Sequence, residues 1–275
     1  MSLIEVLSFT FVQRALLAGI LIAAIAAILG IFLVLRRLSL IGDGLAHITF
    51  GSVAVVLLAG ISPFYVTISA LPLVMLASLA IFKLTSSKKI HGDAAIGILS
   101  SAGIAAGIVL ASLSGGYNVD LFSYLFGNIL TVNQTEIMLS LIIFAAVLCY
   151  VLFFYHDLFA VTFDEELARS MGIKTKKLNI LLFLLTAIAA VLTMKIAGIM
   201  MVSAMLILPP LTALQLSISF RKTIIASVIF STLSVIFGII ASFLLNLPAG
   251  GTIVILNILF LLIVFGVKKI LPALR

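Results

Sequence analysis

The chain has 275 residues and a formal net charge of +7; 64% of its residues are apolar and only 9% are charged. A soluble domain is usually about 25% charged, so this chain cannot cover a globule of its size with polar surface. The composition predicts an integral membrane protein. It does not indicate nucleic-acid binding, because Lys and Arg stand singly or in pairs at the ends of apolar runs, where membrane proteins carry topology signals.

Apolar runs long enough to cross a bilayer recur along the whole chain. A helix rising about 1.5 Å per residue needs about 20 residues to cross the hydrocarbon core. We interpret Met1–Gln13 as an interfacial helix and Leu121–Leu130 as too short to span, and both regions leave the count at about eight to nine. The predicted spans are Arg14–Leu35, Gly44–Gly60, Phe64–Phe82, Ala94–Leu113, Glu136–Tyr155, Leu178–Met194, Ala197–Ser219, Thr223–Leu245 and Thr252–Val267. The fold class is therefore an all-α polytopic bundle, with residues 1–275 forming one transmembrane domain.

Small residues and prolines mark particular spans. The span Gly44–Gly60 is rich in Gly, Ala and Ser, which let helices approach closely in lipid, so we place it inside the bundle. Gly103 and Gly107 form a GxxxG packing face. Pro209 and Pro210 remove backbone donors and are expected to kink or interrupt their span.

The distribution of Lys and Arg sets the orientation. If the loop after the first span is cytoplasmic, all sixteen Lys and Arg except Arg14 and Lys195 fall on the cytoplasmic side. Short cytoplasmic loops carry the excess of basic residues. The C-terminus is therefore predicted to be cytoplasmic.

Asp43 and His47 stand four residues apart at the start of a span. Residues i and i+4 of a helix lie on one face, about 5–6 Å apart at Cβ, so both side chains can point at one spot. Carboxylate oxygen and imidazole nitrogen are ligands for zinc or manganese. Asp43 is also the only acidic residue that we place in or against a span interior, where an ionisable group is by default a functional hypothesis. The pair is a predicted metal site, with its other ligands coming from water or another span.

Two other interpretations use the same residues. Asp43 can be the N-cap of the following helix, with His47 a hydrogen-bonded packing residue. Alternatively, the pair can belong to a proton relay. The spacing alone leaves all three open.

The most polar stretch contains Thr162–Gly172, which reads TFDEELARSMG. Thr162 and Glu165 fit a T-x-x-E capping box, and Gly172 suits the position after a helix C-cap. These signals predict a helix of about two turns, which is either a solvated connector or a docking helix for a cytoplasmic partner. The chain has no G-x-x-x-x-G-K-[ST] phosphate loop, so ATP-driven transport would need a nucleotide site on another subunit.

Five segments of the chain carry a family resemblance. They are VLRRLSLIGDGLAHITFGSVAV (Val34–Val55), GDAAIGILSSAGIAAGIVL (Gly92–Leu110), DLFSYLFGNIL (Asp120–Leu130), FDEELARSMGI (Phe163–Ile173) and AGIMMVSAMLILPPLTALQL (Ala197–Leu216). Their order and spacing, over nearly the whole chain, resemble the membrane permeases of bacterial zinc, manganese and iron ABC importers. Many members have Pro-Gly where this chain has Phe50-Gly51, so the bend after His47 is expected to differ.

The resemblance implies a function and a set of partners. It implies a permease of the bacterial cytoplasmic membrane that dimerises, pairs with two cytoplasmic ATPase subunits and receives metal from an extracytoplasmic metal-binding protein. No permanently bound cofactor is implied, since the divalent metal is cargo and ATP binds the partner. Asp43 and His47 fall on the family's translocation path. The ATPase-coupling helix falls on Phe163, Asp164, Glu165, Glu166, Leu167, Ala168, Arg169, Ser170, Met171 and Gly172.

We therefore expect a non-enzymatic permease for a divalent transition metal. The alternatives are an ABC permease for a larger metal chelate and a proton-coupled carrier that works without an ATPase. An intramembrane enzyme would need a nucleophile with a base, or an acidic dyad, in the spans, and we find neither. Nitrogen and oxygen ligands serve zinc, manganese and iron(II) alike, so the sequence does not choose among them.

Overall fold

The computed structural model describes residues 9–62, 65–86, 92–113, 127 and 132–273. The predicted interfacial helix lies mostly outside these residues, as does almost all of Leu121–Leu130. The helices are α2 (Thr10–Leu35), α3 (Ile41–Leu58), α4 (Val66–Thr85), α5 (Gly92–Leu113), α7 (Gln134–Phe153), α8 (Tyr155–Phe163), α9 (Glu165–Ser170), α10 (Thr175–Ala197), the short 3₁₀ helix η2 (Ile199–Met201), α11 (Val202–Gln215), α12 (Phe220–Leu245) and α13 (Ala249–Ala273). Eight of the helices described are long and apolar enough to cross a membrane, which confirms the polytopic helical bundle.

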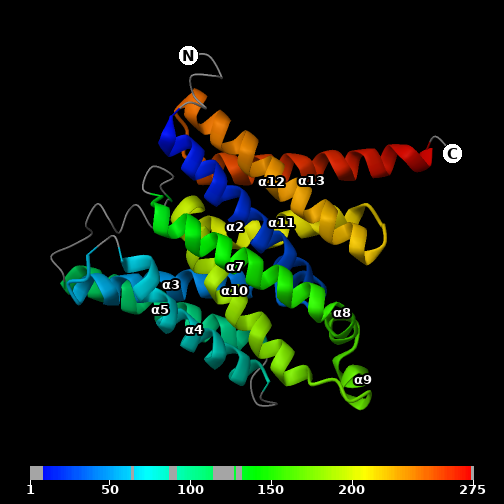
Figure 1. The fold of residues 1–275 in the computed structure, drawn as a ribbon, viewed down its shortest axis with the longest axis horizontal. Helices are drawn as coiled ribbons and strands as arrows, with labels where there is room; N and C mark the ends of the chain where they lie inside the picture. The colour runs from blue at the N-terminus through cyan, green and yellow to red at the C-terminus, as the bar shows by residue number, and fades with distance from the viewer. Residues whose placement is uncertain (1–8, 63–64, 87–91, 114–126, 128–131, 274–275) are drawn as a thin grey trace.

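Helix α2 is the centre of the bundle (Figure 1). It contacts α7, α10, α11 and α12. Within an 18-residue apolar stretch of this helix, 78% of the residues are buried. The hydroxyls of Ser227 and Ser231 on α12 donate hydrogen bonds to the carbonyl oxygens of Ala27 and Ala23 on α2, at 3.3 and 3.0 Å. Side-chain hydrogen bonds and small residues hold helices together in lipid, where burial of apolar surface between helices gains little.

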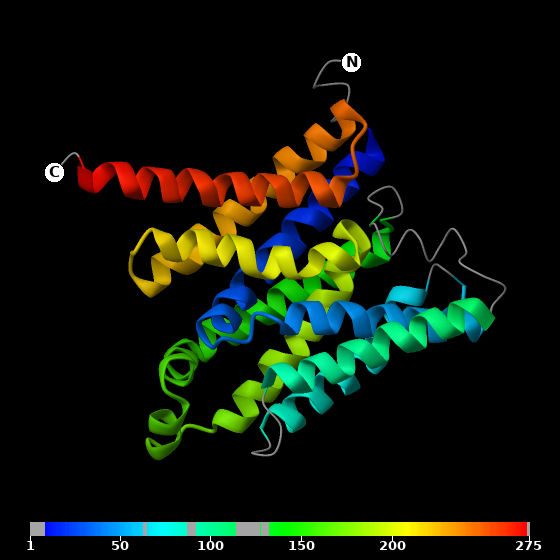
Figure 2. The ribbon, with the colours of Figure 1, turned by 180° about the vertical axis from the view of Figure 1, so that it is seen from behind.

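Helix α3 packs against α4 and α5, which lie side by side, and also contacts α10 and α11 (Figure 2). At the crossing of α3 and α5, a Cβ on Gly51 would lie 2.5 Å from the Gly103 carbonyl oxygen, and a Cβ on Gly103 would lie 2.7 Å from Ile48 Cα. The two backbones therefore touch, which confirms the interior position of α3 and the packing role of Gly103. Helix α3 runs unbroken through Phe50 and Gly51.

This contact gives a stability prediction for Gly103→Ala. The added methyl group meets backbone atoms near His47 and Ile48, so α3 and α5 must separate. We expect a loss of about 1–3 kcal/mol in the free energy of unfolding, measured by thermal unfolding in detergent. Gly97→Ala on the same helix is the control, because nothing lies within 4 Å of its Cβ and Ala gains about 0.5–1 kcal/mol over Gly inside a helix. Equal behaviour of the two variants would contradict the prediction.

The predicted span Ala197–Ser219 is corrected by a break after α10. Gly198 has φ 84°, a conformation that glycine adopts at little cost, and η2 follows before α11 begins at Val202. Helix α11 has 14 residues, about 21 Å at 1.5 Å per residue, and η2 precedes it, so this segment is a broken helix and not the continuous span predicted. Pro209 and Pro210 lie inside α11, so they do not interrupt that helix, and the kink that they are expected to cause stays a prediction.

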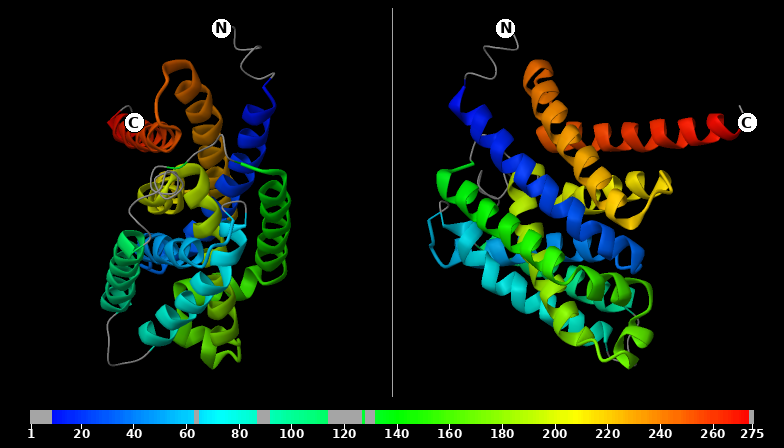
Figure 3. Two further views of the ribbon diagram at one scale, coloured as in Figure 1. Left: turned by 90° about the vertical axis from the view of Figure 1, so that its left-hand side faces the viewer. Right: turned by 45° about the vertical axis from the view of Figure 1, so that its right-hand side comes forward.

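Helix α13 runs away from the bundle toward the C-terminal end of the chain (Figure 3). Its beginning packs on α10, α11 and α12. Within an 18-residue apolar stretch of α13, however, only 17% of the residues are buried. It starts at Ala249 and runs to Ala273, longer than the predicted Thr252–Val267. Lipid or another subunit must therefore cover most of this helix.

Candidate functional site

Asp43 and His47 lie on one face of α3, as the spacing predicts. The distance from His47 Nε2 to Asp43 Oδ2 is 3.5 Å. Leu40 is the N-cap residue of α3, and Asp43 is the third residue of the helix. The interpretation of Asp43 as the N-cap is therefore wrong, and its carboxylate is available for another role.

The pair lies on the uncovered stripe of an otherwise buried helix. Leu40, Asp43 and His47 share this stripe by helical spacing, and the Asp43 and His47 side chains are 51% and 25% exposed. The stripe ends after His47, because Phe50, Gly51 and Ala54 on the same side are buried. Gly42, on one side of the stripe, packs against Ser203 and Leu206 of α11. Gly44, on the other side, packs against Ile96 of α5. The two polar side chains thus face a surface bordered by α5 and α11.

This stripe does not contain a complete metal shell. Among the residues that the structure describes, no group of three or more His, Cys, Asp or Glu side chains is placed to hold a metal ion. One carboxylate and one imidazole supply two ligands of the kind that zinc and manganese accept. The remaining ligands of a metal ion held here would have to be water, other kinds of donor group, residues outside the described part of the chain, or groups of another chain.

The polar stretch folds into two short helices instead of the single helix predicted over Thr162–Gly172. Thr162 belongs to α8, and its hydroxyl donates to the Leu158 carbonyl oxygen at 2.6 Å. The capping-box prediction for Thr162 and Glu165 is therefore wrong. Asp164 caps α9 instead, accepting a hydrogen bond from the Leu167 N–H at 2.9 Å. A helix N-cap needs an extended backbone, and Asp164 supplies it at the end of α8.

The C-terminal end of α9 follows the prediction. Gly172 has φ 85°, its N–H donates to Arg169, and the Ile173 N–H donates to Ala168. These two bonds form a Schellman motif. Helix α9 buries Ala168 but leaves Phe163, Leu167 and Met171 exposed beside and along it, so it presents an apolar surface to whatever covers it.

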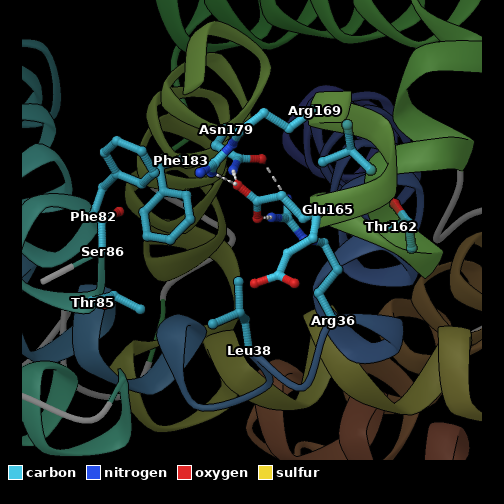
Figure 4. A pocket seen from close by; sticks show the side chains of 12 residues that line it. Arg36, Leu38, Phe82, Thr85, Ser86, Thr162, Glu165, Arg169, Asn179 and Phe183 are labelled. Atoms are coloured by element: carbon cyan, nitrogen blue, oxygen red, sulfur yellow. Dashed lines mark hydrogen bonds and ion pairs between the residues drawn. The ribbon is translucent and has the colours of Figure 1, made fainter. Parts of the chain in front are cut away.

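A closed network of hydrogen bonds connects α9 to the end of α2 (Figure 4). Arg36, the C-cap of α2, donates to Asn179 Oδ1 at 2.7 Å and to Glu165 Oε2 at 3.0 Å. Asn179, on α10, donates to Glu165 Oε1 at 3.0 Å. Burial lowers the pKa of the Arg36 guanidinium, and the Glu165 carboxylate opposes this change. Arg36 stays charged at physiological pH, because arginine is not deprotonated in proteins.

A second charged pair lies at the other end of α10. Lys195 Nζ is 2.6 Å from Glu136 Oε1, and their side chains are only 12% and 7% exposed. Glu136 also accepts hydrogen bonds from the Thr67 hydroxyl and the Asn133 N–H, at 3.0 and 3.1 Å. The prediction that Asp43 is the only acidic residue in or against a span interior is therefore wrong. The pair joins α4, α7 and α10 at one point.

Comparison with known proteins assigns the chain to a family. The model of the ABC 3 transport family matches residues 8–268. The chain belongs to the ABC 3 transport family. The manganese transport system membrane protein MntC of Halalkalibacterium halodurans is 35% identical over 96% of this chain and 90% of its own length. The high-affinity zinc uptake system membrane protein ZnuB of Haemophilus influenzae is 33% identical over 95% of this chain and 100% of its own length.

Solved structures show the same fold. PsaBC from Streptococcus pneumoniae, in complex with Fab, has a TM-score of 0.84 at 33% identity, covering 95% of this chain and 94% of that chain. An inward-facing structure of a putative metal-chelate type ABC transporter has a TM-score of 0.72 at 20% identity, covering 94% of this chain and 85% of that one. The second likeness concerns the fold alone.

The sequence of this ABC 3 family chain did not reveal the partners of Arg36, Asn179 and Lys195. The structure places Arg36 and Asn179 in one network with Glu165, and Lys195 in an ion pair with Glu136. Arg36 was interpreted only as a residue that stops a span. Asn179 and Lys195 stand within or at the end of the apolar run of α10, and a polar residue in such a run is a signal that it meets a partner. The identity of the partner was not available from the spacing, because the contacts of Arg36 lie 129 and 143 residues away.

Proposed function

We propose that this chain is the transmembrane permease of an ATP-driven importer that carries a divalent transition metal ion, manganese, zinc or iron(II), into the cytoplasm. The observation that carries the proposal is the Asp43–His47 pair on the uncovered stripe of α3. An ionisable pair in a span is costly in lipid and marks a polar path. The relatives named as manganese and zinc transport proteins support the same class of cargo.

A second copy of the chain would complete the path. In a symmetric dimer the same surface of each copy meets its partner, so an interface that includes this stripe would bring two carboxylates and two imidazoles together. Such a contact would also remove Asp43 from lipid. Sites for transported ions must bind weakly enough to release them, which two ligands per chain with exchangeable water would allow.

The energy for transport would come from a separate ATPase. The sequence has no phosphate loop, and the exposed Phe163, Leu167 and Met171 give α9 an apolar surface for a cytoplasmic partner. We place the ATPase-coupling segment at Phe163–Gly172. An extracytoplasmic metal-binding protein would deliver the ion at the opposite side. We also propose that α9 and the C-terminus lie in the cytoplasm of a bacterial cell, and the excess of Lys and Arg on that side supports this orientation.

Uptake by proteoliposomes that contain the chain and its co-purified ATPase tests this function. We expect Mn²⁺ or Zn²⁺ to enter only when ATP reaches the ATPase. Uptake by the chain alone, driven by a pH gradient, would show a proton-coupled carrier instead. Uptake of a metal chelate but not of the free ion would show the chelate importer.

A further inference from the structure

The network of Arg36, Glu165 and Asn179 is closed on itself. Each of the three side chains bonds to the other two, at 2.7, 3.0 and 3.0 Å. The Arg36 side chain is 11% exposed and Asn179 is 4% exposed. A guanidinium presents several N–H donors in a fixed fork, so Arg36 holds the two acceptors at a defined distance from each other. The network therefore fixes the relative positions of α2, α9 and α10.

This network connects α9 to a part of the chain that is distant in sequence. Helix α9 has only six residues, of which Ala168 alone is buried. It packs mainly on its chain neighbours α8 and α10. The bond from Glu165 to Arg36 is its side-chain connection to the corner between α2 and α3. A movement of α9 would thus reach that corner through Arg36.

The corner between α2 and α3 is short and tightly bonded. Arg37 has φ 59°, a strained left-handed conformation for a residue other than glycine. The Leu38 N–H donates to Leu33 and the Ile41 N–H donates to Leu38, at 2.8 and 3.1 Å. Asp43 follows in the first turn of α3. The backbone between Arg36 and the Asp43–His47 pair therefore has little freedom to change conformation.

Open space lies beside the network. A cavity of about 490 Å³ is lined by the three residues and by Thr85 and Ser86 at the end of α4 (Figure 4). Packed interiors resist displacement because they have few voids. The cavity leaves the side of α9 that lines it free of such packing, so a movement of α9 in that direction would act on its bonds to Arg36 and Asn179.

We propose that Arg36, Glu165 and Asn179 form a joint that transmits movement of α9 to the first turn of α3. This inference rests on the proposed function and assigns Arg36 and Asn179 as positioning residues for metal transport. Neither touches the ion. Their role is to make the position of Asp43 and His47 depend on the position of the helix that meets the ATPase.

The test measures Mn²⁺ transported per ATP hydrolysed, in proteoliposomes of the permease with its co-purified ATPase. In Arg36→Gln we expect ATP hydrolysis to continue while this ratio falls about tenfold, within the usual range of coupling between sites. Arg169, which lies 3.3 Å from Glu165, is unchanged in that variant, so α9 keeps a neutralising partner. Arg36→Lys keeps the charge but not the fork, and its ratio should lie between those of wild type and Arg36→Gln.

Two comparisons separate the joint from a merely structural role. Arg37→Gln is the matched control, because Arg37 is adjacent but exposed and should keep the wild-type ratio. Arg36→Gln combined with Asn179→Leu should lower the ratio no further than Arg36→Gln alone, since residues of one network are not additive. An unchanged ratio in Arg36→Gln, an equal loss in Arg37→Gln, or a parallel loss of uptake, hydrolysis and melting temperature would overturn the inference.

The same experiment keeps this inference distinct from the proposed function. A wild-type complex that takes up no Mn²⁺, Zn²⁺ or Fe²⁺ with ATP would refute the importer itself. A wild-type complex that transports Mn²⁺ normally, with Arg36→Gln transporting as many ions per ATP, would refute only the joint.

Discussion

Asp43→Ala should abolish ATP-driven metal uptake by the reconstituted permease while leaving the protein folded. The substitution removes the carboxylate oxygen of the only acidic side chain on the uncovered stripe of α3 in the described part of the chain. Loss of a partner that merely orients a ligand costs about 10–100-fold in metal affinity, so loss of a ligand should cost at least that much. Uptake of Mn²⁺ and Zn²⁺ into proteoliposomes measures the effect.

Asp93→Ala is the matched control for Asp43→Ala. Asp93 is also an exposed acidic residue in the first turn of a helix, α5, so both substitutions remove the same favourable interaction with a helix dipole. His47→Ala should behave like Asp43→Ala, because we propose its imidazole as the second ligand. Full uptake by Asp43→Ala, at normal expression and melting temperature, would return Asp43 to a role outside the metal path.

Lys195→Met should destabilise the protein more than any surface substitution. It leaves the buried Glu136 carboxyl group without its 2.6 Å partner. Removing one member of a buried ion pair costs about 3–5 kcal/mol, whereas replacing both members is often nearly neutral. The double variant Glu136→Gln/Lys195→Met should therefore recover much of the loss. Thermal unfolding of the purified permease in detergent measures both.

Lys177→Met provides the control for that series. Lys177 lies on the same helix, α10, but is exposed, and surface substitutions change stability by about 0.5 kcal/mol or less. A double variant as unstable as Lys195→Met would show that the pair itself stabilises the fold. A Lys195→Met variant as stable as Lys177→Met would show that the ion pair contributes nothing.

The prediction that Asp43 and His47 lie on one face of a helix is confirmed, because it depends only on residues close together in the sequence. Asp43 and His47 face the same way because a helix places residues i and i+4 on one side, whatever surrounds it. Gly172 ends α9 because its positive φ favours glycine. The cap of the same helix was assigned to Thr162 instead of Asp164, because both residues have side chains that cap helices and only the end of α8 decides between them.

The sequence by itself determined that this is a membrane bundle, because its composition leaves too few polar residues for any other solvent. It also determined most of the approximate spans, the shared face of Asp43 and His47, and the glycines at which helices pack closely. Only the tertiary structure decided that Glu136 pairs with Lys195, that Arg36 bonds to Glu165 and Asn179, and that one stripe of α3 stays uncovered. The physical reason is separation along the chain. A helix fixes the positions of residues three or four apart, whereas contacts between residues more than a hundred apart depend on how all the intervening helices pack.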